Sequence, residues 1–176
     1  MTGPYVPSAR DVRDMSVHVD HEMSRLLRIG ETLRCWRGLL GLLRQDTILR
    51  ALRVAYAGHA RAVFEFFHDG RPRNVGIRRI HGGDVDVWLS DYTGASPGSH
   101  PWTPEHEQRS GDADKQLAHL STGRLAPARA HLPEWGARED RDRLRPIIQQ
   151  VKADLSATGW WDWFPETARA LEETKG

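Results

Sequence analysis

The strongest helical pattern in the chain covers residues 46–70. Asp46 can cap its start, and the pair Asp69 and Gly70 gives it a stop. At about 100° per residue, its apolar positions form one broad face that can contact two neighbouring elements, which indicates the core of a helical bundle. That face holds Leu52, Ala55, Tyr56, His59, Ala60, Val63, Phe66 and Phe67.

An earlier helix is predicted from Met15 onward, where apolar residues recur at helical spacing and Ser16 or Asp20 can cap the start. Gly30 leaves two alternatives, an interruption or one longer helix that is locally weakened. The glycines and leucines of residues 38–43 predict a packed turn before the central helix.

Residues 70–104 are rich in Gly and Pro and predict a long irregular loop, held down by Trp88, Tyr92 and Trp102. Within it, residues 85–89 allow either a short strand or a buried helical turn. Helical patterns then resume over residues 110–125, with a cap at Ser110 or Asp112, and over residues 138–155, where Pro146 fits the first turn or marks a kink.

Pro165 opens a short, acidic final helix, after Thr158 and Gly159 end the one before it. The chain has no internal repeat, low-complexity tract or convincing β-hairpin. The pattern therefore predicts an all-α, single-domain bundle of about five helices, with a long irregular loop between the central and later helices. This domain covers residues 15–176 and follows a flexible arm at residues 1–14.

The composition of the chain limits its number of domains, its attraction to polyanions and its cellular compartment. The chain has 176 residues and a formal net charge of +1, which suits one domain and predicts no general attraction to polyanions. Its single cysteine, Cys35, excludes an internal disulfide and agrees with a reducing compartment. No apolar run approaches the about 20 residues that span a bilayer, and the N-terminus lacks a secretion signal, so we expect a cytoplasmic protein without membrane contact.

Several chemical classes are excluded by what the sequence lacks. It has no His-Glu-x-x-His motif, no paired cysteines, no Gly-rich phosphate loop and no Gly-x-Ser-x-Gly motif. His18 with His21, and His100 with His106, could each share a metal, but we expect both pairs to be exposed to solvent. No metal or cofactor is therefore expected.

Trp160, Trp161 and Trp163 lie close together in the sequence near the C-terminus, and we interpret these large rings as core or interface packing.

Arg61 and His68 are the main chemical candidates. They lie seven positions, or two helical turns, apart on the face opposite the apolar one. Arg can stabilise charge on a phosphate and His can exchange a proton, which together suffice for metal-free RNA cleavage. In the alternative interpretation, Arg61 pairs with Glu65 one turn along and His68 occupies the frayed helix end.

Four further polar residues are secondary candidates: His59, Lys115, His119 and Arg124. His59 lies within the apolar face, so we expect a buried imidazole that is hydrogen-bonded to a neighbour. Lys115 and His119 share the less apolar face of their helix at one-turn spacing, which suits either a surface role or a second half of a polar site.

Two blocks of the sequence resemble a group of small bacterial helical proteins. The first block begins at His59-Ala60-Arg61 and continues to the Phe66-Phe67 pair, and the second covers residues 114–121 with Arg124 beyond it. These proteins resemble the HEPN superfamily, which includes many metal-independent RNases of toxin and phage-defence systems. The superfamily's catalytic pattern is an Arg, four to six residues and then a His.

Arg61 and His68, with six residues between them, match that pattern. The resemblance implies a metal-independent RNase with a composite Arg/His site at a homodimer cleft, with RNA and an antitoxin or other protein as partners. The superfamily often has Asn, Asp or His directly after the Arg, where this sequence has Ala62. The alternative is a non-catalytic HEPN-like module that binds a partner protein or a nucleotide.

Overall fold

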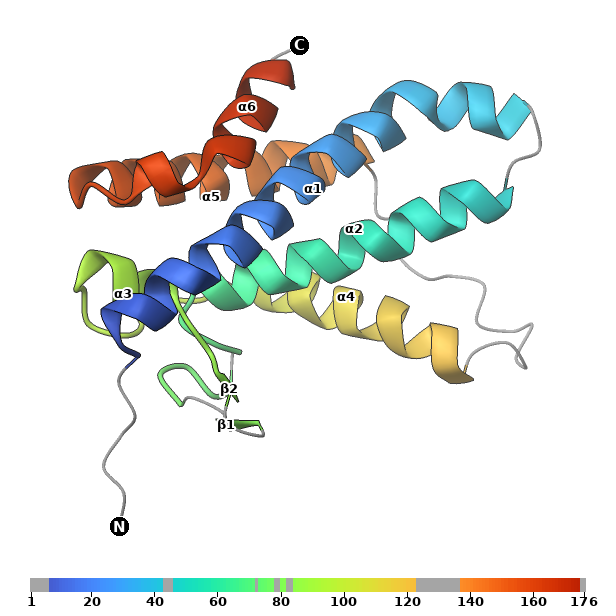
Figure 1. The fold of residues 1–176 in the computed structure, drawn as a ribbon. Coiled ribbons are helices and arrows are strands. Elements are labelled where there is room, and N and C mark those ends of the chain that lie inside the picture. The colour runs from blue at the N-terminus through green and yellow to red at the C-terminus, as the bar shows by residue number, and fades with distance from the viewer. Residues whose placement is uncertain are drawn as a thin grey trace.

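The computed structural model describes residues 7–42, 46–71, 73–77, 80–81, 84–122 and 137–174. This part of the chain is an all-α single domain, as the hydrophobic pattern predicts. Its elements in order are α1 (Ala9–Leu42), α2 (Asp46–Phe67), β1 (Ile80–His81), β2 (Asp84–Val85), α3 (Leu89–Thr93), α4 (Pro104–Thr122), α5 (Ala137–Ala157), the 3-10 helix η3 (Trp161–Trp163) and α6 (Pro165–Glu173) (Figure 1).

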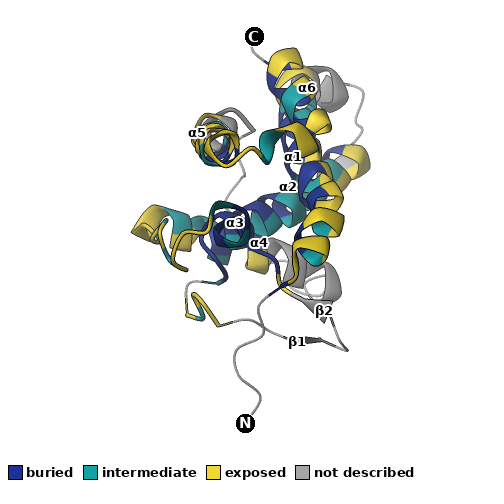
Figure 2. Cartoon of the chain, turned by 60° about the vertical axis from the view of Figure 1, so that its left-hand side comes forward, coloured by how far each residue is buried: buried dark blue, intermediate teal, exposed yellow. Residues whose placement is uncertain are grey.

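The long helix α1 is the central element. It packs against α2, α5 and α6, while α4 packs against α2, so that α4 and α6 lie at opposite edges of the bundle (Figure 1). Figure 2 shows that α1 is buried along the side that faces the other helices and exposed along its outer side. Met23, Tyr56, Ile148 and Phe164 are among the core side chains and are each 1% exposed or less.

The predicted central helix is confirmed as α2, and α1 runs without a break through Gly30. A Cβ atom on Gly30 would lie 3.0 Å from the ring of Tyr56. The glycine therefore lets α2 approach α1 closely, and the alternative of one longer helix is the correct one.

Both ends of α1 differ from the prediction. The helix begins at Ala9, within the predicted arm, because Ser8 and Asp11 cap it reciprocally: the Ser8 hydroxyl accepts the Asp11 N–H at 3.2 Å, and the Asp11 carboxylate accepts the Ser8 N–H at 2.8 Å. At the other end, residues 38–42 continue the helix, so the predicted turn is wrong. The helix propensity of the neighbouring leucines outweighs the cost of about 1 kcal/mol for each glycine.

The helix α4 also begins earlier than predicted. Thr103 caps it by accepting the N–H of His106 at 3.2 Å, and Pro104 takes the first helical position, where its missing N–H costs nothing. Ser110 and Asp112, the predicted caps, are buried inside the helix. The proline that was assigned to the loop is thus the start signal of the helix.

The last two helices follow the prediction more closely. The left-handed Gly159 (φ 78°) comes soon after the end of α5, and Pro165 opens α6. Pro146 lies inside α5 rather than in its first turn.

Side chains from two other helices hold α6 at both ends. The carboxylate of Asp20 on α1 accepts the N–H groups of Glu166 and Thr167 at 3.0 and 2.7 Å. At the opposite end, the guanidinium of Arg145 on α5 donates to the carbonyls of Leu171 and Thr174 at 2.9 and 2.8 Å. A negative group at the N-terminus and a positive group at the C-terminus both suit the helix dipole. Asp20 therefore caps α6, not the helix to which it belongs.

Residues 70–104 hold short elements rather than one irregular loop. β1 and β2 form a two-residue antiparallel pair, with Ile80 opposite Val85, so the expectation of no hairpin is wrong at this point. The short helix α3 follows, and its Tyr92 hydroxyl donates to the carbonyl of Val12 at 2.8 Å. Trp88 and Tyr92 are each 3% exposed, which confirms that they hold this segment against the core.

Candidate functional site

The candidate site is built around the C-terminal end of α2. The N–H of Gly70 donates to the carbonyl of Glu65 at 2.7 Å, a closure that requires a left-handed residue just before the glycine. Asp69 takes that conformation (φ 56°) and is buried. Its carboxylate accepts the N–H groups of Ser90 at 3.2 Å and Gly98 at 2.8 Å. The end of α2 is thus fastened to two later segments of the chain.

Arg61 is engaged by two carboxylates. Its Nε atom lies 2.9 Å from Glu65 Oε1 on the same helix, and a terminal nitrogen lies 3.0 Å from Asp114 Oδ1 on α4. Arg71 also pairs with Glu65, at 2.9 Å. The interpretation in which Arg61 pairs with Glu65 is therefore confirmed, and the pair extends into a network that joins α2 to α4.

His68 is buried, at 1% exposure, which corrects the interpretations that place it on an open polar face or at a frayed helix end. Its N–H still donates to the carbonyl of Phe64 at 3.0 Å, so His68 continues the helical turn, and its side chain is buried because Trp102 and His106 pack against it. The ring stacks on Trp102, with centroids 4.3 Å apart, and meets Phe67 edge-on at 4.8 Å. No hydrogen bond, ion pair or ring contact in the described part of the chain joins His68 to Arg61.

The protonation state of His68 follows from its surroundings. Its Nδ1 atom lies 2.6 Å from the carbonyl oxygen of His100, and since a carbonyl can only accept, Nδ1 carries the proton. Burial lowers the pKa of His68 from 6.5 to about 4, with smaller contributions from His106 and His100, against the opposing effect of that hydrogen bond. At neutral pH the ring is therefore the neutral Nδ1–H tautomer.

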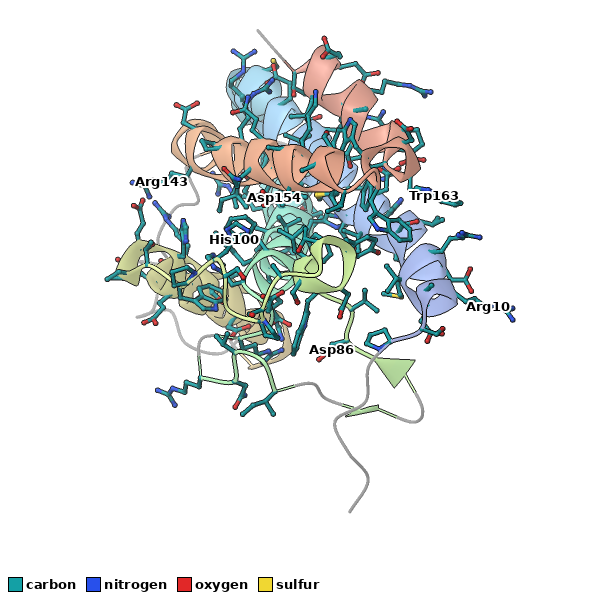
Figure 3. The ribbon with its side chains drawn as sticks, turned by 90° about the vertical axis from the view of Figure 1, so that its left-hand side faces the viewer. Arg10, Asp86, His100, Arg143, Asp154 and Trp163 are labelled. Atoms are coloured by element: carbon teal, nitrogen blue, oxygen red, sulfur yellow. The ribbon has the colours of Figure 1, made fainter. Side chains whose placement is uncertain are left out.

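Two more histidines gather near His68. The ring of His106 lies 4.9 Å from that of His68, and burial lowers the pKa of His106. His100 lies 3.0 Å from Asp154 through its Nε2 atom, which ties the loop before α4 to α5 (Figure 3). His100 and His106 are therefore not a simple exposed pair. The described residues nevertheless hold no group of three His, Cys, Asp or Glu side chains that suits a metal ion.

His59 has the hydrogen-bonded partner that the sequence predicts, although its side chain is only partly buried. Its Nδ1 atom lies 2.7 Å from Glu22 Oε2 on α1, and this hydrogen bond lowers the pKa of Glu22. His21 meets His59 edge-on, with centroids 6.4 Å apart, and both His18 and His21 are exposed. The pair of His59 and Glu22 therefore joins α1 to α2.

The other secondary candidates lie outside the described side chains. Lys115 and His119 belong to α4, but the described side chains of that helix stop before them. Arg124 lies wholly outside the described residues. The expectation of a second polar half-site from Lys115 and His119 stays a prediction, and so does the candidate role of Arg124.

The sequence analysis treats Asp69 only as a helix end and gives no role to the carboxylates of Asp114 and Glu22, although all three form hydrogen bonds or ion pairs in this region. Asp114 stands in the second resemblance block, which was the available signal for its role. The partners of Asp69 and Glu22 come from distant segments, so no local pattern marks them.

The described helices include none with the length and apolarity that crossing a membrane requires. Comparison of the chain with protein-family models, curated proteins and solved structures finds no match.

Proposed function

We propose that this chain is a non-catalytic, HEPN-like helical module that binds a partner, and that Arg61 and His68 stabilise its fold. The observation that supports this proposal is that the side chains of Arg61 and His68 are both already occupied by contacts within the chain. Arg61 is paired with Glu65 and Asp114, and His68 is buried with its Nδ1 proton on the His100 carbonyl.

Catalysis by His68 would require a proton to pass between substrate and ring. A pKa of about 4 makes the neutral ring a weak base at neutral pH and leaves almost no imidazolium to act as an acid. The packed rings of Phe67 and Trp102 also separate it from a substrate. A proton donor or acceptor in RNA cleavage needs both access and a pKa near the working pH.

Arg61 faces a different obstacle. Stabilising a phosphate would require the guanidinium to exchange Glu65 or Asp114 for the new anion, and both carboxylates would then repel that anion. The network is partly open to solvent, since the Arg61 side chain is 27% exposed. A partner subunit could therefore reach it, which is the observation that keeps a composite RNase site in a homodimer as the second candidate.

A cleavage assay separates the two functions. Wild-type protein, Arg61→Ala and His68→Asn are incubated with labelled RNA in the presence of a chelator, and product formation is followed with time. We expect wild-type protein to leave the RNA intact, as the variants do, because neither group can act on a phosphodiester from its present position. Arg143→Ala is the matched control, since Arg143 is also paired with a carboxylate, Glu105 at 2.9 Å.

Cleavage by wild-type protein and by Arg143→Ala, but not by Arg61→Ala or His68→Asn, would contradict the non-catalytic proposal and support the RNase. The same preparations give the oligomeric state by sedimentation, which tests the expected homodimer. Binding of an antitoxin or another protein partner is part of the module proposal and is independent of cleavage.

A further inference from the structure

Three tryptophans near the C-terminus lie at the surface where α1, α5 and η3 meet. Trp160 and Trp161 are partly buried against the core, whereas Trp163 keeps 43% of its surface exposed. Figure 3 shows Trp163 on the same side of the molecule as Arg10, with Arg143 on the opposite side. The sequence prediction of core or interface packing for these rings therefore holds for two of them and leaves Trp163 accessible.

A cationic side chain lies over the ring of Trp163 and another over the ring of Trp161. The guanidinium carbon of Arg13 on α1 lies 4.9 Å from the centroid of Trp163, and the ammonium of Lys152 on α5 lies 5.5 Å from that of Trp161. Cations at these distances are attracted to the negative face of an indole ring. We call Arg13, Lys152, Trp161 and Trp163 the tryptophan surface.

The core supports this surface from below. Trp161 stacks on Phe164 at 6.0 Å with the ring planes only 8° apart, and Phe164 is fully buried. Trp160 meets the buried Tyr92 edge-on at 5.3 Å and lies 6.3 Å from Trp163. Trp161 is therefore held between Phe164 and Lys152, and Trp163 is the ring that offers an exposed surface to a ligand. A ring that is held in place loses little conformational entropy when a ligand stacks on it.

We infer that the tryptophan surface is a binding site for single-stranded nucleic acid. Sites that bind single strands without sequence preference combine aromatic rings, on which bases stack, with cationic groups that contact the phosphates. Here both components occur together and come from three separate elements. A flat indole accepts any base, so the site is expected to recognise the polymer and not a particular sequence.

The charges around the rings favour a polyanion over a protein partner. Arg10, Arg13 and Lys152 are exposed on the helices that carry this surface, and Asp14 and Asp162 are also exposed. Asp14 is paired with Arg10 at 3.6 Å, so these two charges offset each other, while Arg13 and Lys152 lie over the rings themselves. Asp162 lies between the two rings in the sequence, so it should weaken the binding of a phosphate backbone.

This inference names the class of ligand for the proposed binding function. It rests on that function, because it assumes that the protein binds the strand without cleaving it. The binding site contains neither Arg61 nor His68, the residues that the cleavage assay tests. The binding inference and the non-catalytic proposal can therefore be contradicted independently of each other.

Binding is measured by fluorescence anisotropy with labelled single-stranded RNA and DNA of about 15 nucleotides, at low salt, together with quenching of the tryptophan emission. We expect Trp163→Ala to weaken binding by about 5- to 100-fold, the range for losing one stacked base. Trp163→Phe keeps an aromatic face and should retain most of the affinity. Circular dichroism and the thermal midpoint of each variant show that the fold is kept.

Charge variants give a second, independent readout. Arg13→Gln and Lys152→Gln should each weaken binding of every sequence alike and lower the slope of affinity against salt by about 1, as expected for one lost phosphate contact. Asp162→Asn should strengthen binding. Arg143→Gln removes the same charge from the opposite side and should leave affinity close to that of wild type.

The inference is overturned if neither oligonucleotide binds, or if Trp163→Ala and Arg13→Gln bind as wild type does. Self-association that is lost in Trp163→Ala, without oligonucleotide binding, would instead identify a contact between copies of the chain and would also overturn it. A strand that binds at this surface and is then cleaved would support the inference and contradict the non-catalytic function.

Discussion

His68 and Asp69 are adjacent residues that join the end of α2 to the rest of the molecule in different ways. His68 contributes an aromatic ring to a cluster with Phe67 and Trp102, and a proton to the carbonyl of His100. Asp69 contributes a left-handed backbone and a carboxylate that accepts two N–H groups. Both side chains are buried, and their hydrogen-bond partners, Ser90, Gly98 and His100, all belong to the segment before α4, so a single local change should affect this whole segment.

Stability should depend on pH through His68. Because burial lowers its pKa from 6.5 to about 4, the unfolded chain takes up the proton first as pH falls. The stabilisation is complete above about pH 6.5 and is lost as pH falls towards about 4, by about 3 kcal/mol in the free energy of unfolding. Urea unfolding between about pH 7 and about pH 4.5 measures this loss.

His68→Asn is the control for that experiment, because an amide keeps a donor towards the His100 carbonyl and does not titrate. Its free energy of unfolding should fall less steeply with decreasing pH than that of wild type. Equal slopes for the two proteins would show that His68 does not cause the dependence.

Asp69→Ala should destabilise the protein by about 3 kcal/mol, because it leaves the N–H groups of Ser90 and Gly98 without their carboxylate partner. Asp69→Gly loses the same hydrogen bonds but adopts the left-handed conformation freely, so it should cost about 1 kcal/mol less than the alanine variant. Chemical denaturation compares the two. An alanine variant as stable as wild type would contradict the role given to the carboxylate.

Among the helices, capping residues, glycine and proline in the sequence predicted some helix ends correctly and others incorrectly. Asp46 coincides with the start of α2, and the Asp69–Gly70 pair and Pro165 marked real ends because each acts on the backbone beside it. The starts of α1 and α4 were missed although Ser8 and Thr103 are ordinary caps, because the apolar periodicity begins later than the helix does. Asp20 shows a third case, in which a good cap residue serves a helix far away in the sequence.

The helix α6 should open locally when either of its end contacts is removed. Asp20→Ala removes the acceptor for its first N–H groups, and Arg145→Met keeps the aliphatic stem but removes the donors to its last carbonyls. We expect a cost of about 1 to 2 kcal/mol for each, concentrated in α6. Amide hydrogen exchange should show faster exchange in α6 and little change in α2. Exchange that rises equally in both helices would indicate a global effect instead.

At the scale of the whole molecule, the fold class followed from periodicity, because a chain of amphipathic helices has few ways to bury its apolar faces. The site did not follow in the same way. Helical spacing brought Arg61 and His68 together, whereas the environment of His68 depends on His100, Trp102 and His106, which reach it only after the loop folds back. Likewise, no sequence pattern could place Arg13 over Trp163.

Nitrogen-detected NMR of the histidine rings tests the inference that His68 is a buried structural group and not a proton-transfer catalyst. We expect His68 to stay the neutral Nδ1–H tautomer at neutral pH and to titrate with a pKa of about 4. A His68 ring that titrates freely near its usual pKa of about 6.5 would contradict the account, because such a ring would be open to solvent and able to exchange protons with a substrate.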